Sequence, residues 1–516
     1  MLILVSCLFL ILTALALAAL RVFLPEARYA WLVAVGGAIL ALVSIFLWLA
    51  QMPFELTLPA WKPLELFESP IQFRADGVSW ALAIGIAALT LSTMLTAAAR
   101  PVFVNSFSWA GVLALGAVGI LAVTGDNPLT LLLVWAALDL TELIVQLGSV
   151  KGASNNEKVV ISFSTRALGI GFLLWAGILS IADGSAFDFE TMPAGTGIFF
   201  VVAAGLRLGV LPLHLPYNPE SGLRRGLGTS FRMVSAASSL VILGRIPTEG
   251  LESGATPFLM FLAIVAGVYG GWMWLRAPDE LNGRPYWVIG LASLSVLAAL
   301  SGNPIGAVAW GCALILVGGT LFLSSVQDAW VTRMSLVGAW SLSSLPFSLT
   351  ASAWLAGLGL FTPLVIAAQA LVMAGFVRHA LRPTGHDSLV SQPGWARTVY
   401  PAGIILLVLM QLLLGWIGWD GALQVGAWLH AALASLLTLS LVWASRRFRI
   451  FNPVRAHWVA STGERLNSLY QWLWSLYRGS ARIAQTVTQT LEGEGGIMWT
   501  LLFLALFVSL LAQGGQ

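Results

Sequence analysis

The sequence predicts an all-α protein that crosses a membrane many times. Of its 516 residues, 58% are hydrophobic and only 9% are charged, and the mean hydropathy is +0.87. A soluble protein of this length needs far more charge to cover its surface. Runs of about 20 apolar residues, each long enough to cross about 30 Å of hydrocarbon, recur along the chain, so we expect about 14–16 transmembrane helices.

The apolar runs and the turns between them define the expected spans. Most connections are short and contain Pro, Gly, Asn or Asp, as in GDNP and SGNP. The first run has the core of a signal peptide, but no basic stretch precedes it and Arg21 follows, so we interpret it as the first span. The expected spans are residues 1–23, 29–50, 77–98, 106–124, 128–148, 161–182, 196–213, 228–245, 255–275, 286–301, 304–325, 335–357, 359–379, 401–419, 423–445 and 497–513.

Basic residues in the loops predict the topology. Loops after even-numbered spans contain few of them beyond Lys62, Arg74 and Arg245. Because basic loops stay on the cytoplasmic side, we expect both termini to face outward from a bacterial cytoplasmic (inner) membrane. The net charge of +3 belongs to this pattern and gives no case for nucleic-acid binding. The basic residues of the odd-numbered loops are Arg21, Arg28, Arg100, Lys151, Lys158, Arg224, Arg225, Arg276, Arg284, Arg333, Arg378, Arg382 and Arg397.

Residues 446–491 differ from the apolar spans. The segment begins RRFRIFNPVR and continues as LNSLYQWLWSLYRGSARIAQTVTQTL, with leucine and tyrosine at helical spacing and Trp472 and Trp474 among them. This pattern predicts an amphipathic helix at the cytoplasmic interface, leading into the last span at 497–513. The alternative is a plain juxtamembrane linker.

Asp139 and Glu142 lie within an expected span, in the stretch LLLVWAALDLTELIVQLGSV. Ionisable residues at membrane depth are rare and point to function. At positions i and i+3 the two carboxylates project from one face of the helix, where in a low dielectric they would not both ionise easily. We therefore expect them to accept protons. Alternatively, Glu142 lies near the cytoplasmic end and extends its carboxylate to the interface.

Arg207 lies in the apolar stretch GIFFVVAAGLRLGVLPLHLP. A buried guanidinium needs a carboxylate, for which Asp139 or Glu142 is the obvious candidate. The stretch then breaks at two prolines that flank His214, and a broken helix is tolerated only against protein or a water-filled cavity. These features predict a proton-transfer site formed by Asp139, Glu142, Arg207 and His214.

Three further residues are accessory candidates. Arg166 lies in ISFSTRALGIG and Arg232 in TSFRMVS, early in their expected spans, and both would reach the same polar region. The alternative, slightly favoured for both, is that each marks the cytoplasmic end of a helix. His430, in WLHAALAS, is the third candidate, although a lone histidine in such a helix is more often a packing residue.

Four motifs resemble those of the antiporter-like subunits of respiratory complex I, Mrp-type sodium/proton antiporters and membrane-bound hydrogenases. FRADGVSWALAIGIAALTLSTMLT resembles the family's F-R-x-D-G-L-S opening, and GDNPLTLLLVWAALDLTELIV resembles A-D-N-L-L-T-L-F-x-x-W-E-x-x-x-L. GLRLGVLPLHLPYNPE is similar to K-S-A-Q-x-P-x-H-x-W-L-P, and MSLVGAWSLSSLPFSLTASAWLAG to M-P-x-T-x-x-x-F-x-I-G-x-L-A-L-x-G-x-P-P-x-x-G-F. Their order and spacing agree over residues 70–360. Residues 446–513 resemble the lateral helix and final span of the largest such subunit.

The chain departs from these motifs at the titratable positions. Ala136 stands where the family has glutamate, and Asp139 follows about one turn later on the same helix. The first lysine falls on Arg207, which releases a proton far less readily. The central lysine falls on Gly318 and its histidine on Leu314. The expected spans ten to twelve contain no ionisable side chain other than a cysteine.

The resemblance implies two inverted five-helix repeats, each with a broken helix, plus a C-terminal amphipathic lateral helix. The expected domains are N-terminal helices 1–3 (1–105), the first repeat (106–245), a degenerate second repeat (255–379), C-terminal helices (401–445), the interfacial helix (446–491) and the last span (497–513). In this interpretation the first repeat keeps a modified acid–base pair, and the second has lost its titratable chain.

Three functions follow as hypotheses. The leading one is a proton-translocating subunit of a complex I-related multi-subunit assembly such as an NADH–quinone oxidoreductase, with sodium as the alternative ion. The second is a degenerate scaffold that anchors other subunits. The third, from resemblance to a member of the same superfamily, is the proton channel of a two-component inorganic-carbon-accumulating complex.

No cofactor is expected in this chain. The sequence contains no nucleotide, flavin, haem or iron–sulfur motif, so redox chemistry would belong to partner subunits. The two cysteines, Cys7 and Cys312, lie in separate apolar segments and form neither a metal-binding spacing nor a disulfide framework. The expected partners are other membrane subunits, the lipid bilayer and the transported protons.

Overall fold

A computed structural model describes most of the chain. The described residues are 1–24, 29–58, 70–99, 106–149, 153–215, 225–326, 328–354, 357–381, 389–417, 425–448 and 475. The chain divides into two units, Met1–Asn452 and Pro453–Gln516, and nearly all described residues belong to the first. The amphipathic helix expected over 446–491 and the span expected at 497–513 lie outside the described residues, apart from the end of one helix and Ser475.

The predicted all-α membrane architecture is confirmed. Within the described ranges, 13 helices are long and apolar enough to cross a membrane, and α8 (Gly197–Leu208) is a shorter apolar helix. The 13 are α1 (Leu2–Phe23), α2 (Ala30–Trp48), α4 (Gly77–Thr96), α5 (Ser106–Thr124), α6 (Pro128–Ser149), α7 (Ala153–Ala182), α9 (Arg225–Arg245), α10 (Thr256–Arg276), α11 (Glu280–Leu300), α12 (Pro304–Leu323), α15 (Thr362–Ala380), α16 (Gly394–Ile417) and α17 (Val425–Phe448).

Several of these helices begin at a residue whose side chain caps the first turn. Asp76 accepts a hydrogen bond from the backbone N–H of Ser79, and the Ser79 hydroxyl bonds back to the Asp76 backbone, which closes the start of α4. Asn303 caps α12 in the same way and is followed by a proline in the first turn. Such caps satisfy N–H groups that lack partners inside the helix.

A short antiparallel hairpin lies at the end of α9 that carries Arg245. Strands β1 (Phe54–Thr57) and β2 (Gln72–Ala75) pair antiparallel, with Phe54 opposite Ala75. Arg245 donates to Asp76 at 3.2 Å and to Asp126 at 3.3 Å. These ion pairs fasten the start of α4 and the α5–α6 turn to the end of α9.

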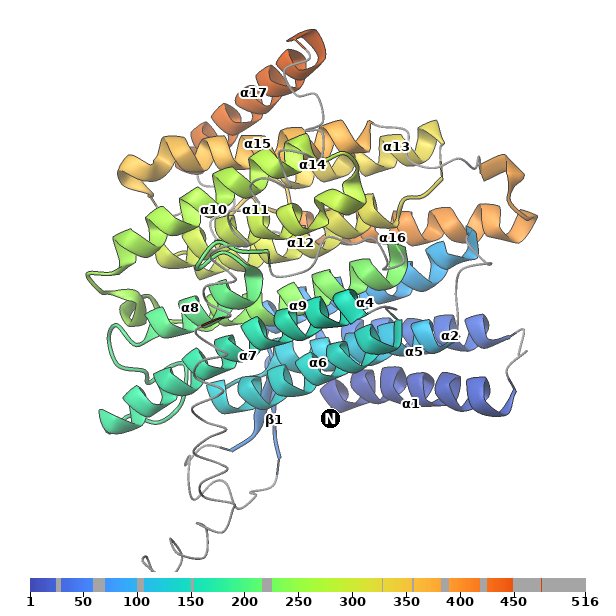
Figure 1. The fold of residues 1–516 in the computed structure, drawn as a ribbon, viewed down its shortest axis with the longest axis horizontal. Helices are drawn as coiled ribbons and strands as arrows, with labels where there is room; N and C mark the ends of the chain where they lie inside the picture. Colours follow the sequence, from blue (N-terminus) through green and yellow to red (C-terminus); the bar gives the residue numbers. More distant parts are fainter. Residues whose placement is uncertain are drawn as a thin grey trace, which may run out of the picture. The chain divides into compact units, whose positions relative to one another are not determined.

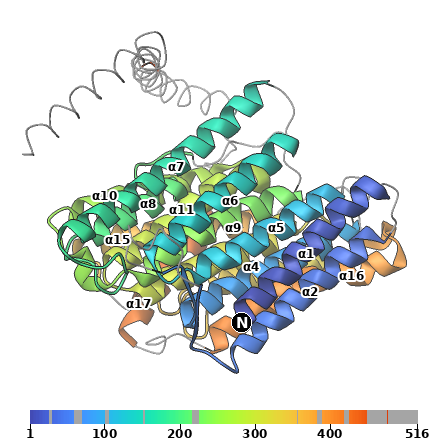
Figure 2. The same cartoon turned by 90° about the horizontal axis from the view of Figure 1, so that it is seen from below.

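Most helices lie side by side with similar axis directions (Figure 1). Helix α6 packs against α5 and α7 (Figure 2), α7 packs against α8, and α5 and α8 pack against α9. Following these five helices, α10 packs against α11 and α15, and α11 packs against α12. Helix α16 returns from the late part of the chain to pack against α4 and α12.

In both groups, α5–α9 and α10–α15, the helix described in the fourth place is too short to cross a membrane. Helix α8 ends at Leu208, ahead of Gly209, whose positive φ of 75° is easy for glycine. It is therefore shorter than the span expected at 196–213.

The continuous span expected at 335–357 is wrong. Two short helices, α13 (Ala329–Ser335) and α14 (Val337–Ser341), precede an irregular segment. Pro346 has no N–H to donate, and Thr350 bonds the Ser341 carbonyl through its hydroxyl at 2.9 Å. Side chains thus satisfy the backbone here in place of helical hydrogen bonds.

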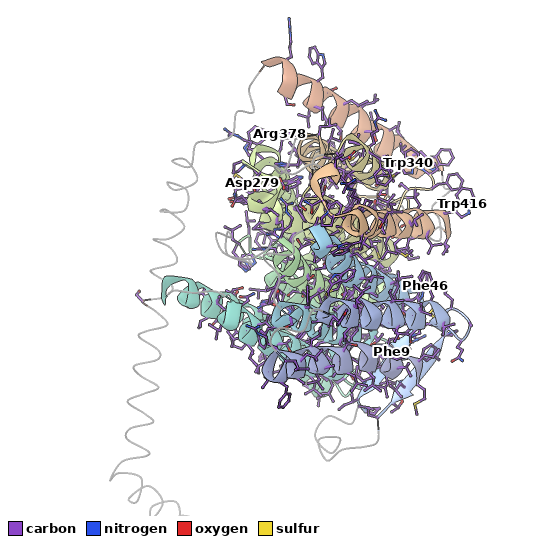
Figure 3. The ribbon with its side chains drawn as sticks, turned by 90° about the vertical axis from the view of Figure 1, so that its right-hand side faces the viewer. Phe9, Phe46, Asp279, Trp340, Arg378 and Trp416 are labelled. Carbon is purple, nitrogen blue, oxygen red and sulfur yellow. The ribbon has the colours of Figure 1, made fainter. Side chains whose placement is uncertain are left out.

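Helix α11 begins at Glu280 rather than at the expected residue 286. The earlier start brings Glu280 and Arg284, which was expected in a loop, into the helix, and both side chains are buried. The helix that replaces the span expected at 286–301 therefore carries two ionisable side chains that the expected span lacks. In Figure 3, Asp279, just before α11, lies near Arg378 on one side of the helices, while Trp340 and Trp416 lie on the other.

Candidate functional site

An ion pair joins α6 to the short helix α8. Asp139 accepts hydrogen bonds from both terminal nitrogens of Arg207, at 2.6 Å from Nη1 to Oδ2 and 2.8 Å from Nη2 to Oδ1. Each residue is 1% exposed. This two-point geometry is the strongest that a guanidinium and a carboxylate form, and both charges are removed from solvent.

A second ion pair lies beside the first. Arg166 of α7 donates to Glu142 Oε2, and its Nη1 is 3.7 Å from Asp139 Oδ1. Arg166 and Glu142 are buried, so neither side chain extends to solvent. Helix α7 begins at residue 153, earlier than expected, which places Arg166 well inside the helix.

Helix α9 supplies neutral hydrogen-bond partners for both arginines. The Ser239 hydroxyl lies 3.1 Å from Arg207 Nε, and the Ser235 hydroxyl lies 3.1 Å from Arg166 Nη1. Residues four apart share one face of a helix, so the two serines face the two guanidinium groups together. The two serines thus orient the two arginines. Among the described hydrogen bonds, none joins a hydroxyl group to either carboxylate.

Trp135 and Gly169 shape the space around Arg207. The guanidinium carbon of Arg207 lies 4.3 Å from the centre of a Trp135 ring, a cation–π contact, and the Trp135 indole N–H donates to the Ser238 carbonyl at 2.8 Å. A Cβ at position 169 of α7 would lie 2.8 Å from Arg207 Cγ. The glycine therefore leaves room for the Arg207 side chain where α7 packs against α8.

Two acids and two arginines thus form one buried, charge-balanced network. The repulsion expected between Asp139 and Glu142 is offset because a guanidinium lies against each carboxylate. The oxygens differ in occupancy: both Asp139 oxygens accept bonds from Arg207, whereas Glu142 Oε1 is buried without a hydrogen bond from a described residue. Glu142 therefore has a free oxygen to which a proton can add, and that proton would neutralise the carboxylate in its ion pair with Arg166.

Solved structures reveal the fold to which this site belongs. The chain superimposes on a chain of the membrane-bound sulfane sulfur reductase, an archaeal respiratory membrane complex, with a TM-score of 0.66 and 14% identity over 98% of this chain and 100% of the other. It matches the Mrp complex from Dietzia with a TM-score of 0.68 and 15% identity, covering 99% of this chain but 63% of that one. A subunit of Thermus thermophilus respiratory complex I matches at 0.59 with 21% identity, over 80% and 98% of the two chains.

The chain has the fold of an antiporter-like membrane subunit. The family resemblance predicted from the four motifs is confirmed at this level. No protein-family model and no curated protein matches the sequence. The antiporter-like fold is therefore recognised through the helix arrangement, at sequence identities below those at which a shared function follows from similarity.

The other predicted residues make different contacts among those described. Arg232 is buried in α9, where it donates to the Gly228 carbonyl at 3.4 Å. His214 follows α8, and its Nδ1 lies 2.8 Å from the Pro212 carbonyl. His430 stacks on Trp354 with ring centroids 5.2 Å apart, away from α6–α9. No described contact joins either histidine to Asp139 or Glu142.

A second buried charged cluster was not predicted from the sequence. Arg225 at the start of α9 donates to Glu280 at 2.7 Å, and Arg284 donates to the Thr229 hydroxyl at 2.8 Å. Arg225 also donates to the carbonyl oxygens of Phe322 and Ser324 at the end of α12. The sequence signal for this cluster is the acidic pair Asp279–Glu280, because acidic residues are typical of a helix start. This signal predicts that α11 begins near residue 280 and contains Arg284.

At the position where the resemblance places a lysine, the second helix group contains an aromatic ring and no ion pair among the described contacts. A Cβ at Gly318, where the resemblance places a lysine, would lie 2.6 Å from Trp287 Nε1, so an indole occupies this space. On another face of α12, the Gln411 side-chain amide donates to Thr320 at 2.8 Å and accepts from Ser341 at 2.9 Å. The space beside Gly318 is thus filled by an indole, and Thr320 is bonded to a neutral amide.

Proposed function

We propose that this chain is a proton-translocating, antiporter-like membrane subunit of a complex I-related multi-subunit assembly. Protons pass through the first helix group, α5–α9, and not through the second. The observation that carries the proposal is the buried network in which Arg207 holds Asp139 and Arg166 holds Glu142.

The carboxylates are the proton carriers in this proposal. Arginine keeps its proton at any physiological pH, so Arg166 and Arg207 serve as fixed positive charges. A proton that arrives at Glu142 Oε1 neutralises that acid and weakens its hold on Arg166, which already lies 3.7 Å from Asp139. Arg166 then shifts toward Asp139, which faces both guanidinium groups while Glu142 holds the proton. When Glu142 releases the proton, its carboxylate recovers Arg166. His214, beyond the end of α8, is assigned to the connection with the cytoplasmic side.

The partners are other membrane subunits. The solved structures of similar fold are chains of multi-subunit membrane complexes, which supports this part of the proposal. Both termini face outward from a bacterial cytoplasmic membrane in the same proposal, and the domain boundaries are those expected from the sequence. Protons are the proposed ion, with sodium as the competing one.

The test is made in the native membrane, with the full chain in its complex. Asp139→Asn keeps the shape of the side chain and removes its charge, and should abolish most of the proton uptake that depends on this complex. The matched control is Asp183→Asn, which changes an exposed aspartate just after α7. Proton uptake that is unchanged in Asp139→Asn, at equal complex levels, would contradict the proposal.

The scaffold hypothesis makes a different prediction. If the network only supports folding, joint neutralisation of Asp139, Glu142 and Arg207 lowers the amount of assembled complex but not the activity per complex. Mass spectrometry of proteins that co-purify with the full chain separates the assemblies, because the carbon-accumulating alternative requires a soluble partner in place of many membrane subunits.

A further inference from the structure

Four large aromatic rings meet inside the second helix group, one from each of four helices. Trp274 (α10), Trp287 (α11), Phe322 (α12) and Phe376 (α15) are all 0% exposed. The centroid of the Trp287 ring lies 5.5 Å from that of Trp274, 6.0 Å from that of Phe322 and 5.9 Å from that of Phe376. Tilted and edge-to-face contacts at these distances are favourable beyond the area they bury.

Glycines on four helices make room for these rings. A Cβ would lie 2.5 Å from Trp274 at Gly283, 2.6 Å from Trp287 at Gly318, 2.5 Å from Phe376 at Gly338 and 2.4 Å from Trp274 at Gly375. Real Cβ contacts are essentially never this short, so each position requires glycine while the rings stay in place. Glycine inside a helix costs about 1 kcal/mol relative to alanine, and here the rings occupy the space gained.

The rings lie directly inward of the charged end of this group. Trp287 follows Arg284 by three residues on α11, so the two share a face of the helix. The Arg284 guanidinium carbon lies 5.9 Å from the centre of the Phe322 ring, and Arg225 donates to the Phe322 carbonyl at 3.0 Å. Water or an ion that passes the Arg225–Glu280–Arg284 cluster therefore meets the aromatic rings next.

We propose that Trp274, Trp287, Phe322 and Phe376 form an aromatic seal that keeps water and ions out of the second helix group from its charged end. The seal extends the proposed function. It depends on that function only for which ion is excluded. It separates the charged cluster from Leu314 and Gly318 on α12, and it makes the second group a dry support for the first.

The seal is tested by thiol labelling of the full chain in native membranes. Cys7 and Cys312 are replaced by Ala, and Leu314→Cys is introduced as a reporter one turn from Gly318, on the face of α12 whose Leu314 carbonyl accepts from Trp287. The probe is a membrane-impermeant, positively charged methanethiosulfonate. We expect no labelling with the rings intact.

Trp287→Ser opens the seal in this background. Serine is used because an apolar cavity stays dry, whereas a hydroxyl next to Arg284 admits water. We expect labelling to become about tenfold faster or more, in line with an opened, hydrated path. Adding Gly318→Leu to Trp287→Ser refills the space and should slow labelling again, which excludes simple unfolding.

The control is Trp80→Ser, which removes a similarly buried tryptophan from α4, where its indole donates to the Ile45 carbonyl. Equal labelling in Trp80→Ser and Trp287→Ser would overturn the seal, as would an unlabelled Trp287→Ser reporter that reacts after denaturation. Neither outcome depends on proton movement through Asp139. The seal and the proposed function therefore fail separately.

Discussion

Arg207 reaches from the short helix α8 to hold both carboxylate oxygens of Asp139 on α6, at 2.6 and 2.8 Å. The pair is buried within the helices, and Ser239 and Trp135 hold the arginine on its other sides. Both charges have been removed from water, so each depends on the other.

Removing one partner should therefore cost more than removing both. Asp139→Asn leaves Arg207 buried without its main counter-ion and is expected to destabilise the protein by about 3–5 kcal/mol, less any relief from the nearby Glu142. The double variant Asp139→Asn/Arg207→Gln should recover a large part of this loss. Unfolding midpoints of the purified protein in detergent, read as a double-mutant cycle, measure the coupling. Additive losses would show that the pair is not coupled.

Arg207→Lys keeps the charge but not the contacts. A lysine ammonium cannot hold both oxygens of Asp139 in a planar, two-point geometry and stacks less well on Trp135. Each lost hydrogen bond to a charged partner is worth about 1.5–3 kcal/mol, so we expect lower stability and reduced complex-dependent proton uptake. The control variant is Arg245→Lys, measured for the same stability and uptake. Arg245 ends α9, the helix that begins at Arg225. Wild-type stability and uptake in Arg207→Lys would count against a role for the geometry.

Gly318→Ala should be tolerated only when Trp287 is smaller. The added Cβ would lie 2.6 Å from Trp287 Nε1, so the single variant must displace the indole at a cost of about 1–3 kcal/mol. In a Trp287→Phe background the nitrogen is gone, and the same alanine should cost much less. Thermal unfolding of the four variants gives the result. An equal cost of alanine in both backgrounds would mean that the ring does not fill this space.

Asp126, in the turn between α5 and α6, should make stability depend on pH. Burial raises the pKa of Asp126 above its ordinary value of 3.8; Arg245 and Arg74 lower it by less, and Glu55 and Asp188 add to the rise. The folded state therefore binds the proton more tightly than the unfolded state, and the stability this contributes is lost as pH rises from about 3.8 through the raised pKa. Asp126→Asn removes this dependence, so wild type should lose stability relative to the variant across that window. A constant difference in unfolding midpoint at all pH values would contradict the expectation.

The sequence alone determined the membrane class and most of the helices. Long apolar runs leave a chain no stable alternative to helices in a bilayer, so α1, α2, α5 and α12 begin and end close to the expected residues. The motifs from 70 to 360 also predicted the antiporter-like fold. The sequence further indicated that Arg207 needs a carboxylate, because a lone buried guanidinium is too costly.

Only the tertiary structure decided which residues meet. Arg166 was expected to mark a helix end, yet it pairs with Glu142 because α7 begins earlier and packs against α6. Glu280 and Arg284 enter the membrane protein's interior because Asp279 caps α11 before the apolar run begins. A hydropathy profile averages the residues of a window. It therefore does not predict a helix cap, an ion pair between distant helices or an indole that fills the space above a glycine. Those contacts join residues far apart in the chain, and they exist only once the helices have packed.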